Sequence, residues 1–346
     1  LPGIELVVTG KVRPAPGLNI IQLREVTDSP VVLLKPPFTQ SSVTELSINL
    51  EKSLLLNQQQ STRTNELRVE VQDLVQQIKM NTVKHRALII EIDDLSVYES
   101  KAIVDALSLN KNIFQFIMLL KTISNECFEI IMRSLRTNRF IKTLTFGGAR
   151  GCLIPVAGSI VADVLLVNKE IKKLCLWSTT INDNDFKIIT EALKRNRTVA
   201  VLYMMENPHL TVQSAVYLSD LIKSTTTLNH VTFDNNFVDN ESTVLIASAL
   251  KSNQSIKTMR MTGGKMSDEC GNALGQMLEQ NKTIEELWLH NNRLTDISAK
   301  ALAKGMRSNS TLKEFWIGGN QFTETSEGGR SLMEAAKAKG VKINWW

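Results

Sequence analysis

Hydrophobic residues recur along most of this chain in a fixed order, a strand-like group followed by a helix-like group. Near the carboxyl end, Leu287 and Leu289 flank Trp288, and Leu302 and Met306 follow four residues apart. The first group has the two-residue period of a β-strand, and the second lies on one face of an α-helix. The same order restarts after about 28 residues, and a period of about 20 to 50 residues is typical of a solenoid.

The period holds over nine predicted strands. Their central residues are Ile89, Ile117, Thr145, Cys175, Tyr203, Thr232, Arg260, Trp288 and Trp316. These residues are separated by 28, 28, 30, 28, 29, 28, 28 and 28 positions. A column of helix residues from Leu107 to Met306 has the same two-residue excess, which falls in the loop from Gly147 to Pro155. Two columns that share one insertion indicate a true structural repeat.

Each repeat predicts one strand, one turn and one helix. In four repeats an Asn follows the strand, where its side chain can bond backbone groups that the turn leaves unpaired. These residues are Asn207, Asn236, Asn292 and Asn320. Residues suited to cap a helix come next, at Ser96, Ser124, Asn182, Asp239, Ser267 and Thr295. Ser96 and Glu99 have the spacing of a capping box.

A single repeat cannot bury its own apolar stripe, so neighbouring repeats must stack. A helix is wider than a strand, so the stack must bend with its strands inside and its helices outside. We therefore predict an α/β solenoid in the form of a horseshoe, with a parallel β-sheet on the concave face and α-helices on the convex face. It should contain about nine to ten repeats of about 28–30 residues, within residues 64–346.

Residues 1–63 do not follow the period. Short apolar runs at Ile4–Val8, Ile20–Leu23 and Val31–Leu34, broken by prolines, predict strands or extended pieces of an amino-terminal capping region. Leu46–Ile48 has the pattern of a degenerate first repeat strand. The polar run Asn57–Thr64 predicts an exposed loop or insertion.

Composition narrows the class of protein without naming a partner. The chain is 43% hydrophobic and 22% charged, which is ordinary for a folded soluble protein. Its net charge is +5, but 40 basic residues are mixed with 35 acidic ones, so no specific nucleic-acid surface is predicted. A helix that spans a membrane needs about 20 apolar residues, and no apolar run approaches that length, so no membrane span is predicted. The four scattered cysteines indicate a reducing, cytoplasmic compartment without a disulfide framework or a zinc site.

Asn-x-Ser/Thr triplets, which have the pattern of glycosylation acceptors, recur in one slot of the repeat. They begin at Asn196, Asn253, Asn281 and Asn309, and all four occupy the same slot of the repeat. We therefore interpret them as repeat consensus, in preference to a secreted glycoprotein.

The order LxxLxLxxNxL followed by a long helix, with a period of about 28 to 29 residues, resembles the ribonuclease-inhibitor class of leucine-rich repeats. The resemblance covers about residues 64–346 and is strongest at Leu287–Leu294 and Leu312–Phe322. The Asn slot departs from the pattern at Asp93, Lys121, Ala149, Thr179 and Gly264. The resemblance implies a protein that recognises a macromolecule, chiefly through the concave face and the loops at its rim.

We therefore expect a non-enzymatic interaction or scaffold module that binds a protein partner and needs no cofactor. The sequence contains no close-spaced metal motif, phosphate-binding loop or nucleophile elbow. The resemblance leaves other functions open. These are a GTPase-activating protein similar to the Ran activator, the ligand-sensing half of an innate-immune-type receptor, and a structural subunit of a ciliary or cytoskeletal assembly.

Large side chains on the concave face need an explanation, because the core between strands and helices does not require them. Trp288 and Trp316 occupy equivalent positions of adjacent strands, with Arg260 on the preceding strand and His290 two residues after Trp288. Trp and Arg are enriched at binding hot spots, so these four residues are the first candidate partner-binding site. The alternative is that the rings only pack on one another along the sheet.

A second candidate patch on the same face comprises Trp177, Tyr203 and Met205. At the amino-terminal end of this face Ile89, Ile117 and Leu119 form an apolar floor. Exposed apolar patches are usually covered or used, and we favour cover by residues 1–63 over cover by a partner.

Basic residues mark the entrances of the strands, at Lys142, Lys172, Lys173, Lys257 and Lys313, and Glu285 and Glu286 interrupt the series. We interpret them as a solvated edge, with steering of an acidic partner as the alternative. Cys175 lies on the predicted concave face, and we interpret it as a small filler in preference to a reactive thiol.

Overall fold

The computed structural model describes residues 6–15, 18–25, 66–148, 154–236 and 239–345. The chain divides into two compact units, Leu1–Arg63 and Thr64–Trp346. In the first unit, β1 (Leu6–Ala15) and β2 (Leu18–Glu25) form an antiparallel pair. That this unit caps the repeats stays a prediction.

The two strands of the first unit differ in how well they follow the apolar pattern. The predicted strand Ile20–Leu23 lies within β2. By contrast, β1 begins inside the predicted run Ile4–Val8 and continues through polar residues to Ala15, because backbone pairing with β2 extends it. The predictions at Val31–Leu34, Leu46–Ile48 and Asn57–Thr64 lie outside the described residues.

The second unit contains one sheet of ten strands, in which every neighbouring pair is parallel. The strands follow one another in chain order from β3 to β12, and the described sheet is open. They are β3 (Ala87–Ile90), β4 (Gln115–Leu120), β5 (Thr143–Gly148), β6 (Lys173–Trp177), β7 (Val201–Met205), β8 (His230–Asp234), β9 (Thr258–Arg260), β10 (Glu286–Trp288), β11 (Glu314–Trp316) and β12 (Lys342–Asn344).

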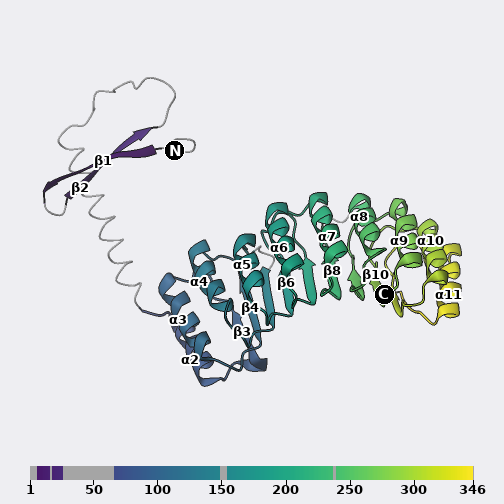
Figure 1. The fold of residues 1–346 in the computed structure, drawn as a ribbon, viewed down its shortest axis with the longest axis horizontal. Helices are drawn as coiled ribbons and strands as arrows, with labels where there is room; N and C mark the ends of the chain where they lie inside the picture. Colours follow the sequence, from purple (N-terminus) through teal and green to yellow (C-terminus); the bar gives the residue numbers. More distant parts are fainter. Residues whose placement is uncertain (1–5, 16–17, 26–65, 149–153, 237–238, 346) are drawn as a thin grey trace. The chain divides into compact units, whose positions relative to one another are not determined.

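One helix precedes the sheet and one follows each strand from β3 to β11, and the helices form a layer on one side of the strands (Figure 1). They are α2 (Val69–Met80), α3 (Val97–Leu109), α4 (Asn125–Leu135), α5 (Gly158–Val167), α6 (Asp183–Arg195), α7 (Val212–Ser224), α8 (Asn240–Leu250), α9 (Asp268–Gln280), α10 (Asp296–Ser308) and α11 (Glu327–Lys339). A short 3₁₀ turn, η1 (Lys84–Arg86), precedes β3. The predicted α/β solenoid of the leucine-rich-repeat class is confirmed.

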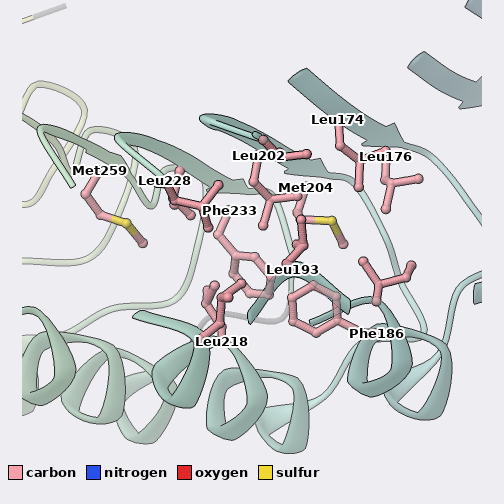
Figure 2. Packing of buried hydrophobic residues seen from close by; sticks show 14 of the residues in the cluster. Leu174, Leu176, Phe186, Leu193, Leu202, Met204, Leu218, Leu228, Phe233 and Met259 are labelled. Carbon is pink, nitrogen blue, oxygen red and sulfur yellow. The ribbon is translucent and has the colours of Figure 1, made fainter. Parts of the chain in front are cut away.

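The core lies between the two layers and is built by the residues that flank each strand centre. Leu174 and Leu176 of β6 and Leu202 and Met204 of β7 are completely buried. They point toward the helices, where Phe186 of α6 lies below them (Figure 2). Burying one such side chain stabilises the fold by about 1.5 to 3 kcal/mol. The apolar stripe of each repeat is therefore covered only when its neighbours are present.

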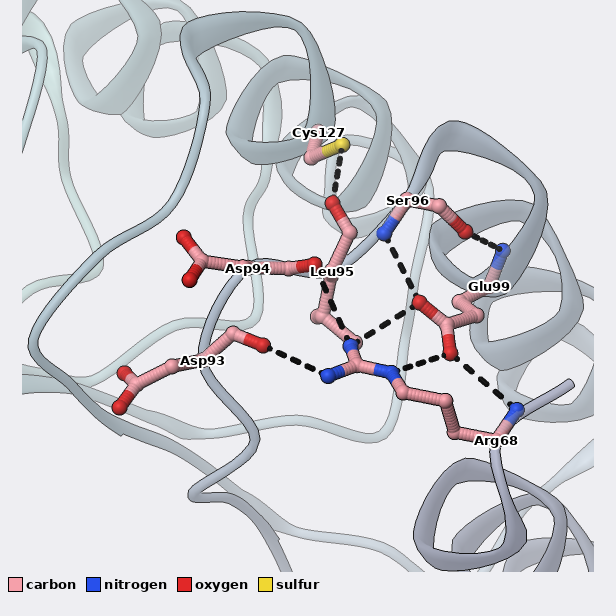
Figure 3. Close-up of polar contacts among 7 residues, drawn as sticks. All are labelled: Arg68, Asp93, Asp94, Leu95, Ser96, Glu99 and Cys127. Atoms are coloured by element: carbon pink, nitrogen blue, oxygen red, sulfur yellow. Dashed lines mark hydrogen bonds and ion pairs between the residues drawn. The ribbon is translucent and has the colours of Figure 1, made fainter. Parts of the chain in front are cut away.

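The start of α3 is held by a capping box and by an arginine from the preceding helix. Ser96 Oγ accepts a hydrogen bond from the Glu99 N–H, and the Ser96 N–H donates to Glu99 Oε2, as the spacing predicted. Arg68, the N-cap residue of α2, donates to both carboxylate oxygens of Glu99 at 2.7 and 3.0 Å (Figure 3). Arg68 also donates to the carbonyl oxygens of Asp93 and Asp94, so it ties α2 to the next repeat.

A buried Asn at the ends of most helices joins neighbouring repeats. Asn281 Nδ2 donates to the carbonyl oxygen of Leu250 at 2.6 Å, and its Oδ1 accepts from the N–H groups of Thr283 and Ile284. The same set of bonds recurs at Asn110, Asn168, Asn196, Asn253 and Asn309. Because these amides are buried and bonded at both ends, the four glycosylation-type triplets serve the repeat.

A second set of Asn residues closes the turns after the strands. Asn207 Nδ2 donates to the carbonyl oxygens of Leu176 and Met205, and its Oδ1 accepts from the Thr179 N–H. Asn236 donates to the Met204 carbonyl oxygen of β7. Asn292 and Asn320 donate to carbonyl oxygens of the residues that directly follow β9, β10 and β11. The predicted role of this slot is confirmed.

Candidate partner-binding surface

The residues at the strand centres lie in one row across the sheet and face away from the helices. The nine predicted centres pair directly from strand to strand, and Asn344 of β12 continues the row. Alternation along a strand places these side chains opposite the buried core. Ile89 is exposed, Cys175 and Thr232 are buried under longer neighbours, and the other predicted centres are half-buried.

Arg260, Trp288 and Trp316 form a continuous stack, which we call the indole stack. The two indole rings are 4.2 Å apart between centroids and inclined by 11°. The Arg260 Cζ lies 4.3 Å from the Trp288 ring centroid. A guanidinium at this distance is attracted by the ring. The His290 ring lies near both indoles, 5.8 Å from Trp288 and 6.5 Å from Trp316, so the structure brings the four predicted residues together.

A carboxylate that sequence reasoning did not single out holds Arg260 in place. Asp234 Oδ2 accepts from Arg260 Nε at 3.0 Å and pairs with Nη2 at 2.8 Å, while Oδ1 accepts from the Thr262 N–H. Asp234 is buried and Arg260 is half-buried, so the pair is partly shielded from water. Asp234 lies two residues after Thr232, the strand centre that pairs with Arg260. This position was a usable signal, because a buried carboxylate needs a partner.

The polar edges of the indoles are turned away from solvent. Among the described residues, Trp288 Nε1, Trp316 Nε1 and His290 Nδ1 are buried and form no hydrogen bond. Burial lowers the pKa of His290, with Asp234 opposing and Arg260 adding to the effect. The part of the two indoles that remains accessible is therefore carbon. An apolar side chain is the group that fits such a surface.

The structure divides the second predicted patch. Trp177 lies beside Met205 in the sheet, and its Nε1 donates to Glu206 Oε2 at 2.9 Å. A Cβ at Gly147 would lie 3.0 Å from the Trp177 ring, so the missing side chain makes room for the indole. The sequence shows the glycine, but only the structure shows that the Trp177 ring occupies the space beside it. Tyr203 makes its ring contacts elsewhere, with Lys173 and His230.

Most of the strand-entrance lysines are paired along the edge of the sheet. Lys142 pairs with Glu170, and Lys257 and Lys313 both pair with Glu285. Hydrogen bonds from the two lysines lower the pKa of Glu285 to about 2. These ion pairs support the interpretation of a solvated edge at Lys142, Lys257 and Lys313.

The remaining predicted features of the face are apolar or unreactive. Ile89 is 42% exposed, and Ile117 and Leu119 beside it are half-buried. Their cover by residues 1–63 stays a prediction. Burial raises the pKa of Cys175 to about 11, so this thiol is protonated at neutral pH and packs as a filler. Among the described residues, no group of three His, Cys, Asp or Glu side chains could hold a metal. None of the described helices could cross a membrane.

No model of a known protein family matches this chain, and no curated protein sequence does. The solved structures that are similar to it include the following two. The actin-binding site 2 of leiomodin-1 is 19% identical over 43% of this chain and 86% of its own, with a TM-score of 0.39. An internalin from Listeria monocytogenes is 15% identical over 74% of this chain and 58% of its own, with a TM-score of 0.44. These likenesses concern the fold alone.

Proposed function

We propose that this chain is a non-enzymatic interaction module that binds a protein partner through its concave face and rim loops. The observation that carries the proposal is the indole stack of Arg260, Trp288 and Trp316, which lies on a face that the core does not use. The lengths of the helices, such as α5 with 10 residues and α6 with 13, support membership of the ribonuclease-inhibitor-like subclass, whose repeats of about 28 to 29 residues include a long helix.

Two physical properties favour the indole stack as a binding site. First, aromatic rings held by stacking lose little conformational freedom when a partner arrives, so less of the contact energy is lost. Second, the charge of Arg260 is already balanced by the buried Asp234, so a partner can cover the guanidinium without leaving a charge unpaired. The partner contact is therefore expected to be centred on the two tryptophans.

The test removes both rings and leaves the sheet intact. The double variant Trp288→Ala/Trp316→Ala and the wild-type protein are used as bait for partner capture with quantitative mass spectrometry. Ile297→Ala, an exposed position on α10, is the control on the helix side. We expect at least one partner whose capture falls about tenfold or more in the double variant and is unchanged in the control, because hot-spot residues cost at least about 2 kcal/mol when removed.

Circular dichroism and thermal melting of both variants check that the fold is retained. If a folded double variant captures the same proteins in the same amounts as wild type, the indoles serve packing only and the proposal is wrong. The identity of the captured protein also separates the other predicted functions. A small GTPase would be tested for accelerated hydrolysis, and an axonemal or cytoskeletal protein would indicate a structural subunit.

A further inference from the structure

Beside the indole stack, Lys173 of β6, Tyr203 of β7 and His230 of β8 lie against one another. We call these three residues the Lys173 cluster. Lys173 Nζ lies 4.1 Å from the centroid of the Tyr203 ring. The His230 ring lies 4.9 Å from the same ring at an interplanar angle of 81°. His230 Nε2 is 3.1 Å from Thr232 Oγ1, which fixes the imidazole against the sheet.

The ammonium group of Lys173 differs from the paired lysines at the sheet edge. Lys142, Lys257 and Lys313 each pair with a glutamate of an adjacent repeat. No carboxylate in the described part of the chain forms an ion pair with Lys173. Its ammonium group lies over the Tyr203 ring instead. Lys173 is half-buried, so a cation–π contact replaces part of its hydration but does not balance its charge.

Lys173 carries the one charge of the cluster that no described carboxylate balances. Burial, with the charges of Arg260 and Lys173 acting in the same direction, lowers the pKa of His230 to about 4 against an opposing effect of Asp234. His230 is therefore neutral at pH 7 and adds no charge of its own. An anion entering the cluster would gain from Lys173, because Asp234 already balances the charge of Arg260. The Tyr203 hydroxyl could donate a hydrogen bond to the same anion.

We propose that the Lys173 cluster binds one carboxylate of the protein partner, while the indole stack beside it binds an apolar side chain of the same segment. This inference rests on the proposed function, because it names the chemistry of the partner at the same face. The row of strand centres runs from Cys175 past Tyr203, Thr232 and Arg260 to Trp288, so one extended segment can cross both sites.

A carboxylate fits this surface better than the backbone of a nucleic acid does. Acidic groups lie on both sides of the cluster, with Glu206 on the Trp177 side and Glu286 and Glu314 beyond Arg260. A chain of phosphates crossing the face would meet these carboxylates at short intervals. A single carboxylate that contacts Lys173 would not have to pass any of these acidic groups.

The test selects ligands without knowing the partner. The immobilised full chain is used to select from a phage library of random dodecapeptides, and the enriched sequences are synthesised. Tyr203 and the two indoles are three to four strand spacings apart, about 14 to 19 Å. We therefore expect Asp or Glu to be enriched about four to six positions from an aromatic or aliphatic residue, since an extended chain rises about 3.3 Å per residue. In titrations, Lys173→Gln should weaken binding of these peptides about tenfold, because a charge-assisted contact is lost. The matched control Lys172→Gln removes the same charge from the adjacent exposed residue and should change affinity less than about twofold.

Two further arms locate the carboxylate. Replacing the peptide's Glu by Gln should weaken binding to the wild-type protein but cause no additional loss with Lys173→Gln, which is the sign of a direct pair. Amidating the peptide's carboxyl terminus distinguishes a terminal carboxylate from an acidic side chain. Peptides that need Trp288 and Trp316 but show no acidic residue, or that bind Lys173→Gln as well as wild type, would overturn this inference and leave the proposed function standing.

If none of the selected peptides depends on Trp288 and Trp316 for binding, both the inference and the proposed function are wrong. A single-stranded oligothymidine of matched length that binds more tightly than the best peptide, and loses that binding in Lys173→Gln, would replace the carboxylate by a phosphate and also overturn the inference.

Discussion

Burial decides what individual ionisable side chains of this protein can do. Cys175 and His230 both lie on the concave face, yet burial keeps the thiol protonated and the imidazole neutral at pH 7. Glu99 is buried as well, but it stays ionised because Arg68 and Ser96 donate hydrogen bonds to it. Residue type alone therefore does not give the charge state, which depends on the donors that other repeats supply.

The Glu99 carboxylate should make the stability of the fold sensitive to acid. Although burial opposes the effect, hydrogen bonds from Arg68 and Ser96 lower the pKa of Glu99 from 4.5 to about 2. A carboxyl group with a lower pKa in the folded state stabilises the fold above its unfolded pKa. That contribution is lost as the pH falls toward the folded pKa. We expect it to be complete above pH 4.5 and to disappear between pH 4.5 and about 2.

Urea unfolding of Glu99→Gln across pH checks this expectation. At pH 7 the variant should lose about 2 to 3 kcal/mol of unfolding free energy, because the hydrogen bonds of buried Glu99 with Arg68 and the capping box are weakened. The difference from wild type should shrink as the pH falls below 4.5. Glu126→Gln, which removes an exposed carboxylate in the first turn of α4, is the control. A difference that is the same at pH 7 and pH 3 would contradict an ionic role for Glu99.

Helix packing at the carboxyl end depends on glycines that allow backbones to touch. A Cβ at Gly305 of α10 would lie 2.1 Å from the Gly275 carbonyl oxygen of α9, and one at Gly275 would lie 2.5 Å from the Ala301 carbonyl oxygen. Glycine within a helix usually weakens it. Here tertiary packing overrides that cost, since the close approach lets neighbouring helices follow the narrower spacing of the strands.

Gly305→Ala should therefore destabilise the protein although alanine favours the helix. The helical preference for alanine is about 1 kcal/mol, and overpacking against a carbonyl group costs about 1 to 3 kcal/mol, so we expect a net loss of up to about 2 kcal/mol. Gly340→Ala is the comparison, because that residue has a φ of +69° and open space around its missing Cβ. It should cost about 1 kcal/mol through backbone strain alone. Urea midpoints measure both changes, and a stabilised Gly305→Ala protein would show that α9 and α10 are not in backbone contact.

The molecule as a whole is a chain of neighbour contacts, so its stability should be a sum over the interfaces between repeats. The helix-end Asn residues supply one set of bonds at most of these interfaces. Thr225 occupies that slot after α7, where its Oγ1 accepts from the Thr227 and Leu228 N–H groups. The threonine side chain has no amide group that could donate to the previous repeat. This interface therefore lacks a bond equivalent to the one from Asn281 to the Leu250 carbonyl oxygen.

Exchanging the two residue types should change stability in opposite directions. Asn281→Thr keeps an acceptor but leaves the buried Leu250 carbonyl oxygen without its donor, which costs about 1 to 3 kcal/mol. Thr225→Asn restores the missing donor and should add about 0.5 to 1.5 kcal/mol. Equilibrium unfolding in urea reports both. Two changes of the same sign would mean that the slot does not join the repeats through the amide.

Much of the candidate surface followed from the period. Trp288 and Trp316 stand on adjacent strands because they lie one repeat apart in the sequence, and the pairing of β10 with β11 places them directly side by side. The capping box of Ser96 and Glu99 also followed from spacing, because both partners lie within one turn. The hydrogen bond from Arg68 to Glu99 completes that network, but it could not be predicted from spacing, because Arg68 lies at the start of the preceding helix.

The pattern of hydrophobic and polar residues along the chain was enough to establish the repeat, the direction of each side chain and the row of residues on the concave face. The reason is that burial alternates along a strand and recurs along a helix irrespective of the ligand. The fold decided which side chains contact the residues of that row: Arg260 lies against Asp234 and Trp288, and Tyr203 lies against Lys173. Long side chains reach several neighbours on adjacent strands, and packing selects among them. Those neighbours come from separate repeats, so no local pattern can rank them.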